Sequence, residues 1–157
     1  HLRILSGLYG LLRPMDAIQP YRLEMGSRLK TRRGKTLYDF WGDTISKALN
    51  QAADEVGTDI LVNCASQEYF GAVDPKALKL RVVTPNFYEV KNGDPKIVSF
   101  FAKKVRGSMA RFIVENRVTT EDGLHDFDLG GYRFVGASDD GANLTFHRDA
   151  EATEAAA

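Results

Sequence analysis

The chain has 157 residues, of which 43% are hydrophobic and 27% are charged. These values are typical of a globular domain and exclude disordered, collagen-like and fibrous compositions, and no run approaches the ~18 apolar residues of a membrane span, which predicts no membrane partner. The net charge is zero, but residues 120–157 hold nine acids and two bases, which leaves 19 bases and 12 acids, an excess of +7, in residues 1–119. Segregation of this kind raises the expectation of a polyanionic partner.

The first half of the chain predicts two short buried strands separated by a loop and a helix. The strands are residues 2–5, which run into a glycine turn, and residues 59–66. Between them, residues 26–35 predict a glycine-bounded basic loop, and the apolar spacing of residues 36–56 predicts one amphipathic helix. Ser66 is placed to cap a short helix that ends near residue 70.

The second half predicts a hairpin, a long helix and two further strands. Asn92 and Gly93 accept the positive dihedral angles of a tight turn, so residues 80–90 and 94–100 predict a β-hairpin. Residues 100–118 predict a helix, residues 131–136 and 143–148 predict strands, and residues 150–157 predict a disordered tail. Together these elements predict a single domain over residues 1–149, with a mixed α/β fold in which helices flank a mixed sheet that contains β-hairpins.

Two basic elements predict contacts with phosphate groups. Five bases occur within residues 28–35 without an acid among them, and a helical wheel places the bases of residues 103–117 opposite the apolar side chains. Gly107 lies within this basic arc, where its missing side chain would let a phosphate backbone come close. The alternative is that both elements are simply solvated. The predicted DNA-contacting positions are Arg28, Arg33, Lys35, Lys103, Lys104, Arg106, Gly107, Arg111 and Arg117.

A pocket for a small molecule is the competing prediction. If the strands at residues 2–5 and 59–66 are parallel neighbours, the loops that follow them, residues 6–13 and 63–69, share a crevice. Polar groups would then converge there as in a ligand site of an enzyme or a nucleotide-binding module. The alternative is that the glycines serve only a tight turn. The pocket positions are Ser6, Gly7, Tyr9, Gly10, Arg13, Tyr21, Arg22, Asn63, Ser66, Glu68 and Tyr69.

No other constellation predicts chemistry. His1, His125 and His147 lack metal-ligand spacing, so neither a metal nor another cofactor is expected. A lone Cys64 in an apolar strand is more often a small core residue than a nucleophile. We identify no catalytic residue.

Long segments of the chain resemble one family. "LRILSGLYGLLRPMDAIQPYRLEMG", "LYDFWGD", "LVNCASQEYF", "KNGDPKIVSFFAKKVRGSMARFIVENR" and the closing "GYRF" and "LTFHR" are similar, in the same order, to the peroxide-stress protein YaaA family. The resemblance covers almost the whole chain, but family members extend further at the amino end. We therefore expect the carboxyl-terminal portion of an unusual YaaA-type fold whose amino-terminal part is missing.

The resemblance implies a cytoplasmic bacterial protein of the hydrogen peroxide response that limits free intracellular iron. It also implies binding of duplex DNA and of branched DNA such as a four-way junction, through a basic cleft and a helix-hairpin-helix-like element. The spacing between Gly7 and Gly10 differs from the usual hairpin of that element, and the family supplies no catalytic residue to carry over.

Overall fold

The computed structural model describes residues 1–149, which form a mixed α/β fold. These residues group into two compact units, the first comprising residues 1–61 and 65–81 and the second comprising residues 62–64 and 82–149. The single domain over residues 1–149 stays a prediction, because two compact units can unfold either together or separately. The predicted tail, residues 150–157, lies outside the described residues.

The first unit opens with a two-stranded antiparallel ribbon of β1 (Ile4–Ser6) and β2 (Gly10–Leu12), in which Ile4 lies opposite Leu12. We predicted a buried strand here, but Ile4 is 46% exposed because two paired strands cover only part of each other. The expected parallel neighbour is also wrong, since β3 (Ile60–Val62) belongs to a different sheet.

The helix predicted at residues 36–56 is two helices, α1 (Leu37–Trp41) and α2 (Thr44–Val56). Gly42 separates them with a φ of 49° and a ψ of −122°, a backbone conformation that side chains other than glycine rarely adopt. α2 ends, as predicted, at Gly57 in the left-handed conformation. No helix within residues 1–149 has the length and apolar character that crossing a bilayer requires.

The core of the first unit forms where these elements meet α3 (Gln67–Phe70). Ser66 caps α3 as predicted, because its side chain accepts a hydrogen bond from the Tyr69 backbone N–H. The buried residues of this core are Met25, Leu37, Ile45, Leu49, Ala72 and Val73.

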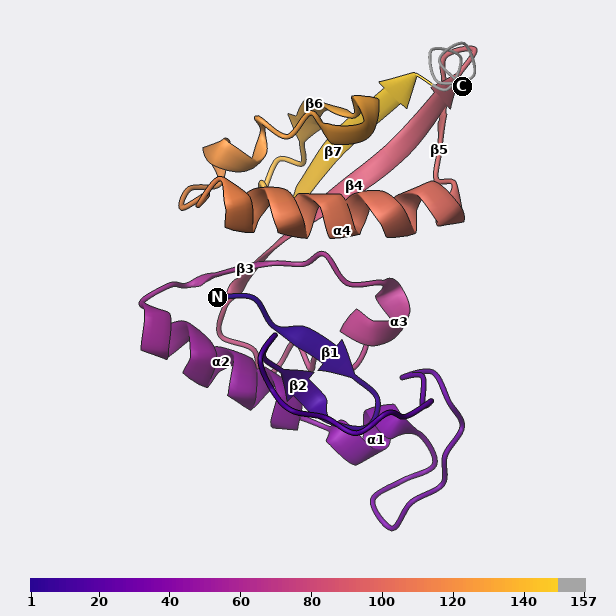
Figure 1. The fold of residues 1–157 in the computed structure, drawn as a ribbon, viewed down its shortest axis with the longest axis vertical. Helices are drawn as coiled ribbons and strands as arrows, with labels where there is room; N and C mark the ends of the chain where they lie inside the picture. The colour runs from indigo at the N-terminus through magenta and orange to yellow at the C-terminus, as the bar shows by residue number, and fades with distance from the viewer. Residues whose placement is uncertain (150–157) are drawn as a thin grey trace. The chain divides into compact units, whose positions relative to one another are not determined.

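A five-stranded mixed sheet, most of which belongs to the second unit, has the order β3-β4-β7-β6, and its short fifth strand, β5, pairs with β4 (Figure 1). The hairpin of β4 (Arg81–Lys91) and β5 (Asp94–Lys96) is confirmed, with positive φ angles at Asn92 and Gly93 in its two-residue turn. β6 (Arg133–Ala137) runs antiparallel to β7 (Asn143–Asp149), whereas β7 runs parallel to β4.

One long helix, α4 (Ser99–Glu115), runs along the sheet of this unit (Figure 1) and buries Val105 and Met109 as the helical wheel predicts. The short helices η1 (Asp122–Leu124) and η2 (Leu129–Gly131) follow it. α4 ends earlier than predicted, because Arg117 takes a φ of 51° and the Val118 N–H bonds back to the Ile113 carbonyl. This six-to-one bond closes the helix end and satisfies a carbonyl that the helix leaves free.

The core of the second unit contains aromatic rings and one buried ion pair. Phe87 stacks on Phe146 at 5.2 Å between ring centroids and meets Phe127 edge to face at 5.7 Å. Arg148 donates from Nε and Nη2 to Oε2 of Glu89 at 2.9 and 2.8 Å, and the Tyr132 hydroxyl donates to the other oxygen of Glu89. The pKa of Tyr132 is raised, mainly by burial and then by the neighbouring Glu89 carboxylate, so the hydroxyl keeps the proton that it donates.

Candidate nucleic-acid interface

The basic loop of residues 26–35 has a defined conformation in the first unit. Thr31 and Gly34 form an isolated antiparallel bridge, and the Arg33 N–H donates to the Thr31 hydroxyl at 3.1 Å. Asp39 of α1 accepts from the N–H groups of Lys35 at 2.9 Å and Thr36 at 3.0 Å, so the first turn of the helix holds the end of the loop. The Thr36 hydroxyl in turn accepts from the Asp39 N–H, which completes a capping box.

The side chains of this loop are presented to solvent. Five basic residues of the loop are exposed, and none of them takes part in an ion pair within residues 1–149: Arg28, Lys30, Arg32, Arg33 and Lys35. The Arg33 guanidinium lies 4.9 Å from the centroid of the Phe40 ring, which orients it without neutralising it. The hydrogen bond from Thr36, followed by that from the Lys35 backbone, holds the pKa of Asp39 below its usual value. The loop is therefore an exposed cationic surface.

The face of α4 predicted to be basic is also exposed. Lys103, Lys104, Gly107 and Arg111 are exposed, and no atom lies within 4 Å of where a Cβ of residue 107 would stand. Arg111 is partly neutralised, since its Nε lies 2.8 Å from Oε1 of Glu115. The available charge on this face is therefore concentrated on the two lysines.

Two predicted members of this helix face differ from the expectation. Arg106 is half-buried and its Nε donates to the Ala102 carbonyl at 3.2 Å, so it is less available to a ligand than a free side chain. Arg117 lies beyond the end of α4 with a positive φ, and the wheel does not describe its direction. The basic loop belongs to the first unit and α4 to the second, so each basic surface is described by itself.

Three of the predicted pocket residues meet in the first unit. The Ser6 and Tyr21 hydroxyls lie 2.5 Å apart, and the Tyr9 and Tyr21 rings meet edge to face at 5.5 Å. The Tyr9 hydroxyl accepts from the Gln19 N–H at 3.0 Å. These polar groups hold the residues after β2 against the ribbon, which is a structural role; a role in ligand binding stays a prediction.

The opening glycines serve close packing. A Cβ on Gly7 would stand 2.4 Å from the Leu23 carbonyl oxygen, and one on Gly10, whose φ is 73°, would stand 2.7 Å from the Trp41 ring. Trp41 also donates from its indole nitrogen to the Gly7 carbonyl at 3.1 Å. The tight glycine turn therefore accommodates the tryptophan of α1.

The remaining pocket residues make contacts of their own, and α3, which carries Glu68 and Tyr69, contacts β1. Glu68 accepts from the Gly26 N–H at 2.8 Å, and Ser66 caps α3 beside Tyr69, whose pKa is raised mainly by burial. Arg22 is exposed, and Asn63 belongs to the second unit. The shared crevice was conditional on parallel neighbouring strands, a condition that β1 and β3 do not meet because they lie in different sheets, and the pocket itself stays a prediction.

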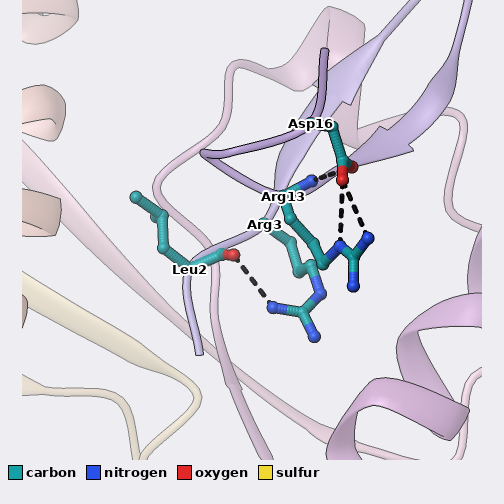
Figure 2. Close-up of polar contacts among 4 residues, drawn as sticks. All are labelled: Leu2, Arg3, Arg13 and Asp16. Carbon is teal, nitrogen blue, oxygen red and sulfur yellow. Dashed lines mark hydrogen bonds and ion pairs between the residues drawn. The ribbon is translucent and has the colours of Figure 1, made fainter.

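Arg13 takes part in a different arrangement from the one predicted. Figure 2 shows Arg13 folded onto Asp16, with its Nε and Nη2 both 3.0 Å from Oδ1, while Arg3 donates from Nη1 to the Leu2 carbonyl at 3.0 Å. Hydrogen bonds from the Arg13 backbone and then its side chain lower the pKa of Asp16. Both arginines line a hollow of about 210 Å³ on the first unit. Arg3 was missed by the sequence analysis, since a single arginine in a strand carries no motif.

Metal and thiol chemistry find little support in this part of the chain. Within residues 1–149 no group of three or more His, Cys, Asp or Glu side chains could hold a metal ion. His125 stacks on Phe134 at 3.8 Å between centroids and His147 meets Tyr88 edge to face, so both pack against aromatic rings. Cys64 is half-buried, and burial raises the pKa of its thiol to about 11.

Comparisons with known proteins fit this fold and composition. The sequence model of the family described as peroxide stress protein YaaA matches residues 1–138. A UPF0246 protein of Ruegeria pomeroyi is 74% identical over 134 residues, which cover 85% of this chain and 52% of the relative. One from Caulobacter vibrioides is 62% identical over 148 residues, or 94% of this chain and 58% of the relative. The chain thus spans little more than half the length of these relatives, and it belongs to the family of the peroxide stress protein YaaA.

Proposed function

We propose that this chain binds DNA, duplex or branched, by contacting phosphate groups with its two basic surfaces, as part of the response to hydrogen peroxide. The observation that carries the proposal is the basic loop, where five exposed cationic side chains within eight residues form no ion pair in the described part of the chain. Phosphate neutralisation by lysine and arginine supplies most of the affinity in sequence-independent binding.

The form of the two surfaces favours phosphates over bases as the groups contacted. The loop is a bridged turn whose backbone is bonded to itself and to Asp39, and it offers no helix that could enter a major groove. On α4, Lys103 and Lys104 flank the open space above Gly107, where a sugar-phosphate backbone can approach without meeting a side chain. Phosphate contacts position a protein on DNA but carry no sequence information, so we expect little sequence preference.

The cellular part of the proposal rests on the family. Its name supports a role in peroxide stress, and we propose the cytoplasm as the place of action and a lowered level of free iron as the outcome. Because the relatives are nearly twice as long as the matched segment, we assign to these 157 residues only the DNA-contacting share of that role.

The salt dependence of DNA binding tests the proposal with a matched pair of variants. Arg28→Gln/Lys35→Gln removes two exposed cations without an ion pair, whereas Arg13→Gln/Lys47→Gln removes two cations that pair with Asp16 and Asp43. Each lost phosphate contact lowers the slope of log K against log salt by ~0.9, so the loop variant should lose about 2 from the slope. Fluorescence anisotropy of a labelled duplex over a salt series measures it.

The matched variant separates specific contact from net charge. Both double variants lose two positive charges, so a general field effect would change their slopes equally. We expect the slope of log K against log salt to fall by well under 1 in the Arg13→Gln/Lys47→Gln variant, because both of these cations already have carboxylate partners. No binding of duplex or junction by the wild-type chain at low salt, or an unchanged slope in the loop variant, would contradict the proposal.

A further inference from the structure

A cluster of exposed apolar side chains lies at the start of α4. Ile97 is 61% exposed and Phe100 is 74% exposed, although both are large and apolar. They stand between Lys96 of β5 and the lysine pair Lys103 and Lys104, in a stretch that contains no acid from residue 95 to residue 114. An exposed aromatic ring surrounded by cations indicates a binding surface more than a site of chance exposure.

The ring and the lysines share one face of the helix. Lys103 and Lys104 lie three and four residues after Phe100, and Gly107 lies four and three residues after the two lysines, which places the four residues on one face of the α-helix. All four are exposed, while Val105 and Met109 on the other side are buried. This face therefore presents one aromatic ring, then two positive charges, then an open glycine.

A chain of contacts holds the Phe100 ring in place. It meets the Phe101 ring edge to face at 5.5 Å, and the Arg148 guanidinium lies 4.4 Å from the centroid of Phe101. Arg148 is itself fixed by the buried ion pair with Glu89 at 2.8 Å. Phe100 is therefore largely exposed and has as its neighbour a ring that a fixed arginine contacts.

We propose that Phe100 is a stacking residue for an unpaired base of DNA, with Lys96, Lys103 and Lys104 holding the flanking phosphates. This inference rests on the proposed DNA binding and adds to it a preference for DNA that contains unpaired nucleotides. Aromatic side chains beside a basic track are the usual means of binding unpaired bases, because every base has a face on which a ring can stack. In a fully paired duplex the bases are already stacked on each other, so the ring gains little there.

The limited extent of the apolar cluster argues against a lipid surface as its partner. A helix that lies in a membrane interface needs an apolar face along much of its length. On α4 the large exposed apolar side chains are Phe100 in the first turn and Val114 in the last, and the exposed face between them carries Lys103, Lys104 and Gly107. One ring and one isoleucine match the size of a base.

Binding to two DNA molecules that differ by one bulge tests this inference. The full chain is titrated by anisotropy against a fully paired duplex and the same duplex with an unpaired bulge that carries a fluorescent purine analogue. Phe100→Ala is compared with Val114→Ala, a matched removal of a 54% exposed apolar side chain from the same helix. Because Phe100 is mostly exposed, its loss leaves no large cavity, and circular dichroism verifies the fold of each variant.

We expect the wild-type chain to prefer the bulged DNA and Phe100→Ala to lose roughly 5- to 150-fold in affinity for it, the range of base-aromatic stacking. Its affinity for the paired duplex should change less than about twofold, Val114→Ala should bind both as the wild type does, and Phe100→Trp should keep the preference.

The outcomes distinguish the inference from the proposed function on which it rests. If the wild-type chain binds both DNAs equally, or if Phe100→Ala keeps the preference for the bulge, the stacking role is refuted while DNA binding stands. The same variants are also tested for binding to vesicles that contain an anionic phospholipid. If Phe100→Ala loses binding to these vesicles but binds the bulged DNA as the wild type does, the stacking role is refuted in favour of a lipid surface. If the wild type binds neither DNA, the proposed function itself fails.

Discussion

The buried pair of Glu89 and Arg148 predicts a large loss of stability when only one partner is removed. The two side chains are 7% and 10% exposed, and the guanidinium donates twice to one carboxylate oxygen. Arg148→Met keeps much of the apolar stem but leaves the Glu89 carboxylate with the Tyr132 hydroxyl as its remaining hydrogen-bond donor among the described side chains. A buried charge that loses its partner costs about 3–5 kcal/mol in the free energy of unfolding.

The double variant Glu89→Gln/Arg148→Met isolates the charge. Glutamine removes the negative charge and keeps a carbonyl that can accept from Tyr132, so most of the penalty should disappear. We expect the double variant to lie within ~1–2 kcal/mol of the wild type, since replacing a buried pair by neutral groups is often close to neutral. Because domains are stable by about 5–15 kcal/mol, the single variant loses a large share of its total.

Two probes in one urea titration measure this effect. Trp41 is the single tryptophan of the sequence and lies in the first unit, whereas the ion pair lies in the second. Far-ultraviolet circular dichroism follows both units. If residues 1–149 unfold as one domain, Arg148→Met shifts both transitions together; if the units unfold separately, the fluorescence transition of Trp41 stays in place.

Two results would refute the reasoning about the pair. A single variant whose unfolding free energy stays within about 0.5 kcal/mol of the wild type would show that the pair contributes little, as at an ordinary surface site. A double variant as unstable as the single one would show that the loss came from the contacts of the Arg148 guanidinium with the Phe101 and Tyr132 rings rather than from the unpaired charge.

Two further predictions concern glycine and cysteine. Gly107→Ala should raise the free energy of unfolding by ~1 kcal/mol, because alanine favours a helix and its Cβ would meet no atom within 4 Å. Gly34→Ala should lower the free energy of unfolding by ~1–3 kcal/mol, because its Cβ would stand 2.1 Å from the Cβ of Asp39. Urea unfolding measures both variants, and equal effects would contradict the structure. With a thiol pKa of about 11, Cys64 should react with iodoacetamide at pH 8 roughly 100-fold more slowly in the folded chain than in urea, and equal rates would show that burial does not protect it.

Locally determined elements were predictable from the sequence. Asn92 and Gly93 specify the hairpin because few other residue pairs accept two positive φ angles, and Ser66 specifies the start of α3 through its own side chain. The buried side of α4 follows from apolar spacing alone. In each case the deciding contact joins residues that are near neighbours in the chain.

The errors arose where the decisive residue or contact was not local to the pattern. Gly42 interrupts an apolar spacing that continues across it, so periodicity alone predicts one helix where there are two. The pairing of β4 with β7 joins Thr84 to Asn143, and no local signal distinguishes it from a pairing with β1. The premise of the predicted crevice was of this kind, since it depended on which strands are neighbours.

The candidate surfaces also divide into features with a local sequence signal and features that only the three-dimensional structure reveals. Exposure of the basic loop and of the lysine pair follows from charge, because unpaired cations stay hydrated. The ion pair of Arg13 with Asp16 three residues later also has a local signal, but the sequence left open whether Arg13 contacts a ligand or serves the local structure. Phe100 was included in the predicted helix without a role, since only the three-dimensional structure reveals that its ring is exposed.

The chemistry of Cys64 bears on whether a thiol of this chain is suited to react with peroxide. Peroxide oxidises the thiolate, so cysteines that sense it combine a low pKa with solvent access. Burial raises the pKa of Cys64 to about 11, which keeps the thiol protonated at neutral pH. Lysine and arginine, in contrast, hold phosphate at any physiological pH without activation. We therefore expect the single thiol to be a packing residue, and the phosphate contacts proposed for the loop and α4 do not require thiol chemistry.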